Sequence, residues 1–136
     1  MPTTRKTKPA SATADAATGD PTVAFRMRVM LGDTIAIGPG KVALLEAIRD
    51  HGSISRAAKS LEMSYRRAWV LLQEINQSMR VPAVSSDQGG QHGGGSVLTP
   101  EGEAVIRLYR TIEQQAKDGS AAQIRDLLAL LAGPSR

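Results

Sequence analysis

The chain has 136 residues, which is enough for one compact domain with tails and too short for two full domains. Hydrophobic residues make up 41% of the chain but aromatic residues only 3%, so the core must be aliphatic, a composition that favours helices over a β-sandwich. The chain has no cysteine, which excludes disulfides, thiolate metal sites and cysteine nucleophiles, and its net charge of +4 indicates an anionic partner.

The N-terminal residues carry no folding signal. Residues 1–21 are rich in Thr, Ala, Ser, Pro and Lys and show no hydrophobic period, so they cannot offset the entropy lost on ordering, and we expect a disordered arm. They also lack the apolar segment of a signal peptide, and no apolar run in the chain approaches the roughly 20 residues that span a bilayer. We therefore expect a cytoplasmic protein with no membrane partner.

A β-hairpin is predicted next. Residues 23–31 alternate apolar and polar side chains, with Arg26 and Arg28 on the polar face, which is typical of a strand. Gly32-Asp33 can turn this strand into a second one over residues 34–37. The following sequence GPGK lacks the remaining residues of a phosphate-binding loop, because no Gly precedes Gly40 at the required spacing and Val42 follows the Lys.

Three helices with tight connections follow within about 40 residues, a spacing that indicates a compact helical unit. The first covers residues 41–50 and stops at Gly52. Ser53 can cap the second, whose small residues Ala57 and Ala58 allow close approach of a neighbour. Ser64 can cap the third, which runs to about residue 79 and ends before a proline at position 82. Its predicted buried stripe consists of Ala68, Leu72, Ile75 and Met79.

A hairpin and two further helices complete the chain. Short β-prone segments at 83–84 and 96–98 flank a stretch with five glycines between positions 89 and 95. Thr99-Pro100-Glu101 is a strong helix start. We expect this helix to reach about residue 117 and to present Val105, Leu108, Tyr109, Ile112 and Ala116. Ser120 is the predicted cap of the last helix, whose apolar face would hold Ala121, Ile124, Leu127, Leu128 and Leu131.

The order of these elements indicates a helix-turn-helix followed by a wing. The second helix of such a motif enters the major groove of DNA, where the side chains of its first turn meet base edges. Residues 53–80 carry five basic side chains and two acidic ones, which concentrates the basic charge on the two motif helices. Either of the paired arginines Arg66 and Arg67 can contact a guanine edge or a phosphate. Trp69 can pack against the wing or the helix flank, or stack on DNA.

The run GSISRAAKSLEMSYRRAWVLLQEIN and the following GGQHGGGSVLTPEG resemble the N-terminal domain of ModE-type molybdate-responsive transcriptional regulators. The similarity extends over residues 26–116 and includes Asn76 and Gly102. The resemblance implies a LysR-like winged helix-turn-helix, with a supporting helix at 53–61, a recognition helix at 64–79 and a wing at 84–98. The fold class expected is thus mainly α with a small β component, with a domain over 22–118 and a C-terminal helix over 119–136.

Family members that sense molybdate carry C-terminal oxyanion-binding domains, and this chain ends about 20 residues after its long helix. We therefore expect no cofactor in this chain and no molybdate sensing by it alone. A single histidine in the glycine-rich segment has no second metal ligand nearby, so we expect no metal site. The candidate DNA-contacting residues are Ser53, Ser55, Arg56, Ser64, Tyr65, Arg66, Arg67, Gln73, Gln91 and His92.

The function expected is that of a sequence-specific DNA-binding transcriptional regulator of molybdenum-related genes. The alternative is an accessory or protein-interaction module that uses the winged fold to dock a partner. An enzyme is not expected, because no paired carboxylates, activated nucleophile or metal cluster occurs at a workable spacing. The Leu-rich segment 124–131 can either form a homodimer contact or pack on the chain's own core.

Overall fold

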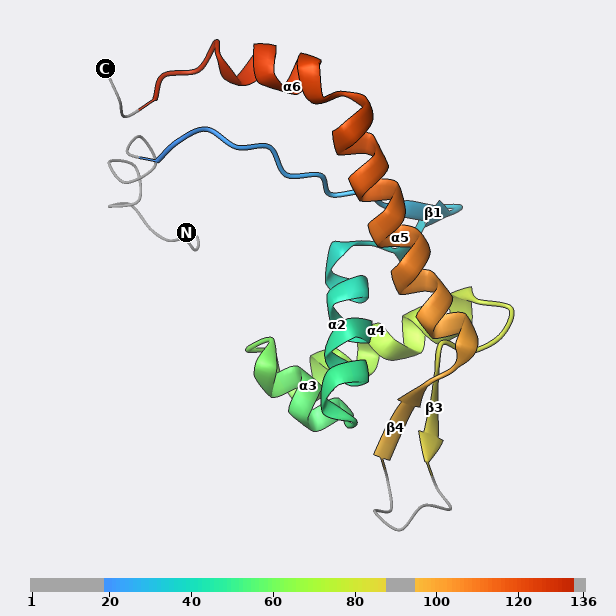
Figure 1. The fold of residues 1–136 in the computed structure, drawn as a ribbon. Coiled ribbons are helices and arrows are strands. Elements are labelled where there is room, and N and C mark those ends of the chain that lie inside the picture. The colour runs from blue at the N-terminus through green and yellow to red at the C-terminus, as the bar shows by residue number, and fades with distance from the viewer. Residues whose placement is uncertain (1–18, 88–94, 134–136) are drawn as a thin grey trace. The chain divides into compact units, whose positions relative to one another are not determined.

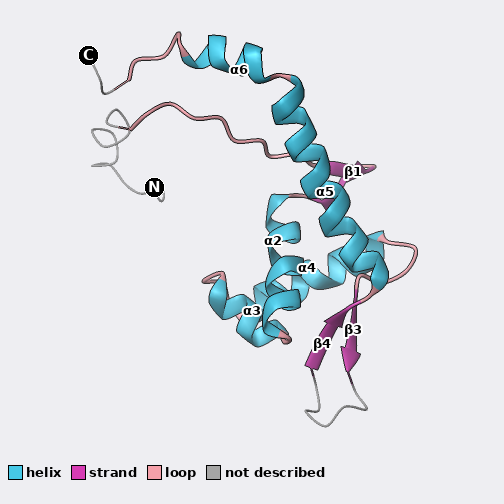
Figure 2. Ribbon diagram, in the orientation of Figure 1, coloured by secondary structure: helices cyan, strands magenta, loops and turns pink. Residues whose placement is uncertain are grey.

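The computed structural model describes residues 19–87 and 95–133 (Figure 1). Residues 26–115 form one compact unit, and the described parts of the two chain ends, 19–25 and 116–133, belong to a second unit. Most of the predicted disordered arm, residues 1–18, lies outside the described part of the chain. The described elements are helical apart from two short hairpins (Figure 2), which confirms the expected fold class.

The first hairpin is shorter than the alternating pattern predicts. Strand β1 (Val29–Leu31) pairs antiparallel with β2 (Thr34–Ile37), and Gly32 makes the turn with a positive φ of 62°. The prediction of a strand that starts at residue 23 is wrong, because residues 23–28 have no strand pairing. The reason is the length of the partner: β2 has four residues before the chain turns into the next helix, so no backbone remains to pair with residues 23–28.

Three helices follow near the predicted positions, although α2 starts at Pro39, two residues earlier than predicted. Helix α2 (Pro39–His51) ends at Gly52, whose φ of 79° is the left-handed conformation that glycine adopts without strain. Helix α3 (Ile54–Ser60) and helix α4 (Tyr65–Ser78) are each capped by the predicted serine, which accepts a hydrogen bond from an amide of the first turn. The two serine caps fix where α3 and α4 begin, and with them the length of the turn between the two helices.

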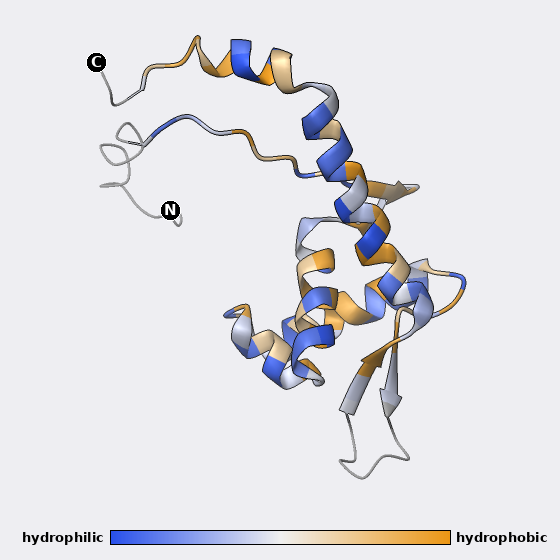
Figure 3. Ribbon diagram, in the orientation of Figure 1, coloured by the Kyte–Doolittle hydropathy of each residue, from blue (hydrophilic) through white to orange (hydrophobic). Residues whose placement is uncertain are grey.

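The core of the compact unit is aliphatic, as the composition predicts. Leu44, Leu45 and Ile48 of α2 are fully buried together with Ile75 of α4. Figure 3 shows the apolar stretches of α2 and α4 where the two helices meet. The remaining buried hydrophobic residues are Ala36, Ile37, Val42, Ala47, Ala57, Ala58, Ala68, Leu72, Ala83, Val84, Ile106 and Tyr109.

The second hairpin is built from β3 (Val84–Asp87) and β4 (Gly95–Leu98), which pair antiparallel from Val84–Leu98 at the base to Asp87–Gly95. One hydrogen bond ties the hairpin to the end of α2, and a second one closes the base of the hairpin itself. Ser96 N–H donates to Gly52 O at 3.0 Å, and Thr99 N–H donates to Ala83 O at 2.9 Å. The hairpin therefore occupies the place and order of a wing after α4.

Helix α5 (Pro100–Gly119) starts where Thr99 predicts, with the Thr99 hydroxyl accepting from Gly102 N–H at 3.1 Å. Its predicted apolar face is partly wrong. The buried residues are Gly102, Ile106 and Tyr109, whereas Leu108 and Ile112 are exposed. The buried side is rotated because Gly102 packs on the Ala83 backbone, where a side chain has no room, and this contact orients the helix.

Helix α6 (Ala121–Leu128) follows α5 and has no buried residue. The predicted serine cap is wrong: the Ser120 hydroxyl donates back to Ala116 O and makes no cap hydrogen bond. A serine hydroxyl can bond backward along a preceding helix as readily as forward to a following one, and sequence does not distinguish the two. Of the predicted apolar face, Leu127 and Leu131 are exposed.

Candidate nucleic-acid interface

The turn between α3 and α4 sets the spacing of the two motif helices. Leu61 N–H donates to Ala57 O and Ala58 O, and Met63 N–H donates to Ala58 O at 3.0 Å. Glu62 adopts a positive φ of 58°, the left-handed conformation that lets the chain reverse within four residues. Both alanines are buried, so α3 packs closely against its neighbours, as their small size predicts.

The first turn of α4 projects from the compact unit. Ser64 Oγ accepts the amide proton of Arg67 at 3.0 Å, which satisfies one of the free amides at the helix start. At 100° per residue, Arg66 lies nearly opposite the buried face formed by Ala68, Leu72 and Ile75. Tyr65 is 54% exposed. The side chains that the sequence assigns to base contacts are thus accessible to a partner.

Trp69 lies one turn beyond Tyr65 and is 46% exposed. The indole is therefore half covered by the fold and half available. Gln73, a turn further along, is half-buried. Tyr65, Trp69 and Gln73 lie four residues apart in succession, so they follow one stripe along α4 beside Arg66.

The paired arginines of α4 point to different surroundings. Arg66 lies on the outward face, while Arg67, 100° further around the helix, lines an open cleft between α4, the β1–β2 hairpin and the start of α2. Arg26 and Arg28 line the same cleft. The alternating sequence pattern puts these two arginines on the polar face of a predicted strand, and it contains no signal that this face lies beside α4.

The candidate residues of α3 have mixed roles. Ser53 Oγ accepts Arg56 N–H at 3.1 Å, so this hydroxyl acts as a helix cap. The Arg56 guanidinium donates to His51 O at 3.4 Å and remains exposed, as does Ser55. The structure thus keeps Ser55 and Arg56 accessible and gives Ser53 a structural task at the start of α3.

The two wing candidates, Gln91 and His92, lie outside the described residues. The described part of the wing exposes Ser85, Ser86 and Val97. No group of three metal-binding side chains occurs among the described residues, and no helix there is long and apolar enough to cross a membrane.

The positive charge of α3 and α4 is not cancelled by neighbouring acids within the described part of the chain. Glu74, the acidic residue on α4, is held by Lys41 at 3.2 Å between Nζ and Oε1, and Lys41 is 7% exposed. Lys41 also donates to Ile35 O. The lysine of the GPGK sequence thus has a structural role. None of the ion pairs among the described residues involves Arg66, Arg67, Arg26 or Arg28.

Comparison with known protein families supports the assignment of α3 and α4 as a helix-turn-helix. Residues 40–103 match the family described as bacterial regulatory helix-turn-helix protein, lysR family. The matched range runs from the start of α2 through both motif helices and the wing into α5.

Individual relatives show the same similarity. The chain is 47% identical over 77 residues to the molybdenum-pterin-binding protein MopB of Rhodobacter capsulatus, covering 57% of this chain and 28% of that protein. It is 35% identical over 88 residues to the transcriptional regulator ModE of Haemophilus influenzae, covering 65% and 34%. It is 38% identical over 100 residues to the DNA-binding transcriptional dual regulator ModE of Escherichia coli K12, covering 68% and 38%.

These matches confirm the resemblance stated from the sequence. The chain spans about a third of the length of these relatives.

Proposed function

From the match of residues 40–103 to the lysR family of bacterial helix-turn-helix domains, we propose that the chain is a sequence-specific DNA-binding transcriptional regulator. The observation that carries the proposal is the exposed first turn of α4, where Arg66 projects away from the core with no ion pair among the described contacts. The family is a regulatory one, so it favours a regulator over an enzyme.

In the proposed complex, α4 lies in the major groove of duplex DNA. The planar guanidinium of Arg66 can donate two parallel hydrogen bonds to a guanine edge, and Tyr65 stands next to it. In this proposal the exposed Ser55 and Arg56 of α3 contact phosphates, and such contacts position the domain without adding sequence information. Specificity then rests on the first turn of α4.

We propose further that the regulated genes are related to molybdenum. The support is the similarity to ModE regulators and to a molybdenum-pterin-binding protein. The first turn of α4 is already exposed in the described domain. We therefore propose that DNA binding does not depend on molybdate.

We propose a homodimer as the active form. Exposed leucines on and after α6, of which Leu130 is 80% exposed, offer an apolar surface of the kind that a second copy covers. A symmetric dimer places two α4 helices about one DNA turn apart and reads a palindromic site. A cytoplasmic location fits this function. A monomeric mass in solution at micromolar concentration would exclude the dimer.

The experiment that tests the function measures binding of the chain to labelled duplex DNA. We expect tight binding that weakens steeply with salt, because contacts to phosphates release counterions. Arg66→Ala is expected to weaken binding to a preferred duplex about tenfold or more, in line with the roughly 1–3 kcal/mol of a good base contact. Arg107→Ala, which removes the same charge from an exposed position on α5, is the matched control.

An affinity for duplex DNA that does not change with salt concentration would contradict the proposal and favour the protein-docking alternative. If Arg66→Ala and Arg107→Ala both bind the preferred duplex as tightly as the parent, α4 is not the helix that reads the DNA.

A further inference from the structure

We infer that the cleft beside α4 is a second DNA-contacting surface. It binds phosphates of the DNA strand that passes the flank of α4 away from the wing. This inference rests on the proposed DNA-binding function. It assigns a role to Arg26 and Arg28, which lie in the described segment before β1 and outside the matched helix-turn-helix residues.

The charge of the cleft is the first observation. Its lining contains four basic side chains, Arg26, Arg28, Lys41 and Arg67, and two acidic ones, Asp33 and Glu74. Lys41 and Glu74 pair with one another, so they cancel. The three arginines are exposed, and none of them takes part in an ion pair among the described residues. Asp33 offsets only part of the charge of the three arginines, so the cleft keeps a net positive charge.

The position of the cleft is the second observation. Asn76, through which α4 holds the base of the wing, and Arg67, through which α4 lines the cleft, are nine residues apart. At 100° per residue these positions lie half a turn apart, on opposite flanks of α4. The wing base and the cleft thus lie on either side of the outward face that carries Arg66.

The dimensions of DNA give this arrangement its meaning. A helix with its side chains is about 10–12 Å across and the major groove is about 12 Å wide, so a helix in the groove brings both its flanks to the phosphate strands that border it. One DNA strand then lies on the wing side of α4, and the other DNA strand lies at the cleft. Arginine is suited to the second contact, because its fork of N–H donors matches the oxygens of a phosphate.

The placement of Arg28 is supported by packing. Its Cγ lies 3.8 Å from the position that a Cβ on Gly38 would occupy, so the aliphatic stem of Arg28 runs close to the backbone at the start of α2. A stem that rests on the backbone loses less freedom when its guanidinium binds a phosphate.

The test uses the double variant Arg26→Gln/Arg28→Gln, which removes both charges and keeps long polar side chains. The matched control is Arg107→Gln/Lys117→Gln, which removes two charges from exposed positions on α5 that do not line the cleft. Binding of each full-length protein to a mixed-sequence duplex of about three helical turns is measured over a series of salt concentrations. A mixed-sequence probe is sufficient because phosphate contacts do not depend on sequence.

We expect the slope of log K against log salt to become shallower by about 1–2 for the cleft variant, since each lost phosphate contact removes about 0.9. The control is expected to keep the parent's slope. The cleft variant should lose the same factor in affinity on a preferred and on a mixed duplex, whereas Arg66→Ala should lose more on the preferred one.

An unchanged slope in the cleft variant, with Arg66→Ala still weakened, would overturn the cleft assignment and leave the proposed function standing. A parent protein that binds no duplex would overturn both.

Discussion

The side-chain amide of Asn76 on α4 binds both backbone groups of Val84 at the start of the wing. Asn76 Nδ2 donates to Val84 O at 3.2 Å, and Asn76 Oδ1 accepts Val84 N–H at 3.3 Å as well as Ala83 N–H at 2.9 Å. The amide thereby acts as a strand partner for the first residues of the hairpin. The wing is fixed to the same helix that carries the proposed base-contacting residues, so one side chain sets their relative position.

Replacement of this amide is expected to destabilise the domain. In Asn76→Ala, the amides of Ala83 and Val84, two buried residues, lose their partner. Leaving a buried backbone group unsatisfied costs about 1–3 kcal/mol, so we expect a loss of about 2–3 kcal/mol in the free energy of unfolding. Urea unfolding followed by circular dichroism measures it. Gln77→Ala, at an exposed position on the same helix, is the control and should change stability little; equal stabilities for the two variants would refute the role of Asn76.

The contact between α5 and the wing base predicts that Gly102 cannot carry a side chain. A Cβ at this position would lie 2.2 Å from Ala83 O, and that carbonyl is fixed because it accepts Thr99 N–H. Gly102→Ala must displace backbone, and we expect it to cost about 2–3 kcal/mol, at the upper end of typical single substitutions.

Gly40 provides the matched comparison. It also lies in the first turn of a helix, α2, and a Cβ there would meet nothing within 4 Å. Gly40→Ala is expected to leave stability unchanged or to raise it by up to about 1 kcal/mol, because alanine favours a helix. Thermal unfolding of both variants checks the contrast. A Gly102→Ala protein as stable as the parent would show that α5 is not held at this distance.

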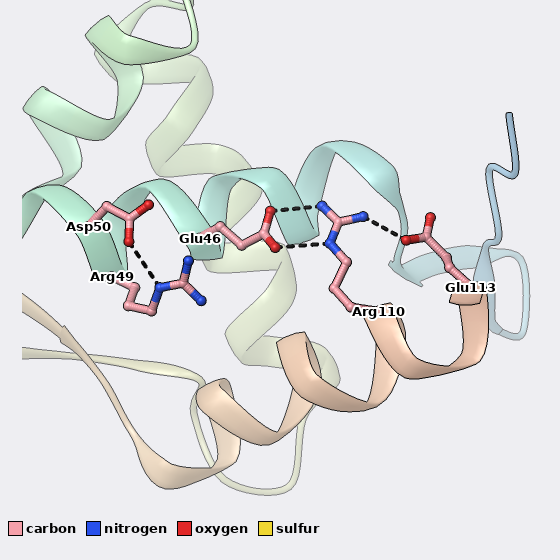
Figure 4. A network of polar contacts seen from close by, with 5 residues as sticks. All are labelled: Glu46, Arg49, Asp50, Arg110 and Glu113. Carbon is pink, nitrogen blue, oxygen red and sulfur yellow. Dashed lines mark hydrogen bonds and ion pairs between the residues drawn. The ribbon is translucent and has the colours of Figure 1, made fainter. Parts of the chain in front are cut away.

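A salt-bridge network between α2 and α5 predicts a pH dependence. Arg110 contacts Glu46 with two hydrogen bonds of 2.9 and 2.7 Å and Glu113 with one of 2.7 Å (Figure 4). The hydrogen bond from Arg110 lowers the pKa of Glu46 below its ordinary value of 4.5. A carboxylate with a lowered pKa stabilises the fold above its unfolded-state pKa, and this stability is lost as pH falls through the folded-state value.

The variant Glu46→Gln is therefore expected to be less stable than the parent by about 1 kcal/mol at neutral pH, a modest value because the pair is partly exposed to solvent. The difference should shrink as the pH falls below 4.5. Unfolding free energies of both proteins across the acidic range measure this difference. A stability gap that stays constant through this range would mean that the carboxylate charge of Glu46 is not what holds α5 to α2.

Much of the fold could be predicted because local signals determine it. Gly52 ends α2, and the serines at positions 53 and 64 cap α3 and α4, since these interactions involve residues at most four positions apart. The signal for the buried stripe of α4 is equally local. The helix-turn-helix and its position before a hairpin follow from such signals and from the resemblance of the sequence to known regulators.

The rest depends on contacts between distant segments. The rotation of α5 is set by Gly102 against Ala83, which no periodicity in α5 reveals. The start of β1 depends on the length of its partner, and an alternating pattern does not show that length. The approach of Arg26 and Arg28 to α4 is a tertiary contact, so no local pattern groups them with Arg67.

The central claim is that the first turn of α4 reads bases in duplex DNA. It is tested most directly by selection of bound sequences from a pool of random duplexes, carried out in parallel with the parent protein and with Arg66→Ala. We predict that the parent enriches a defined palindromic motif, with or without molybdate, and that the variant loses the base preference at one position of each half-site. No enrichment by the parent, or the same motif from both proteins, would contradict the claim.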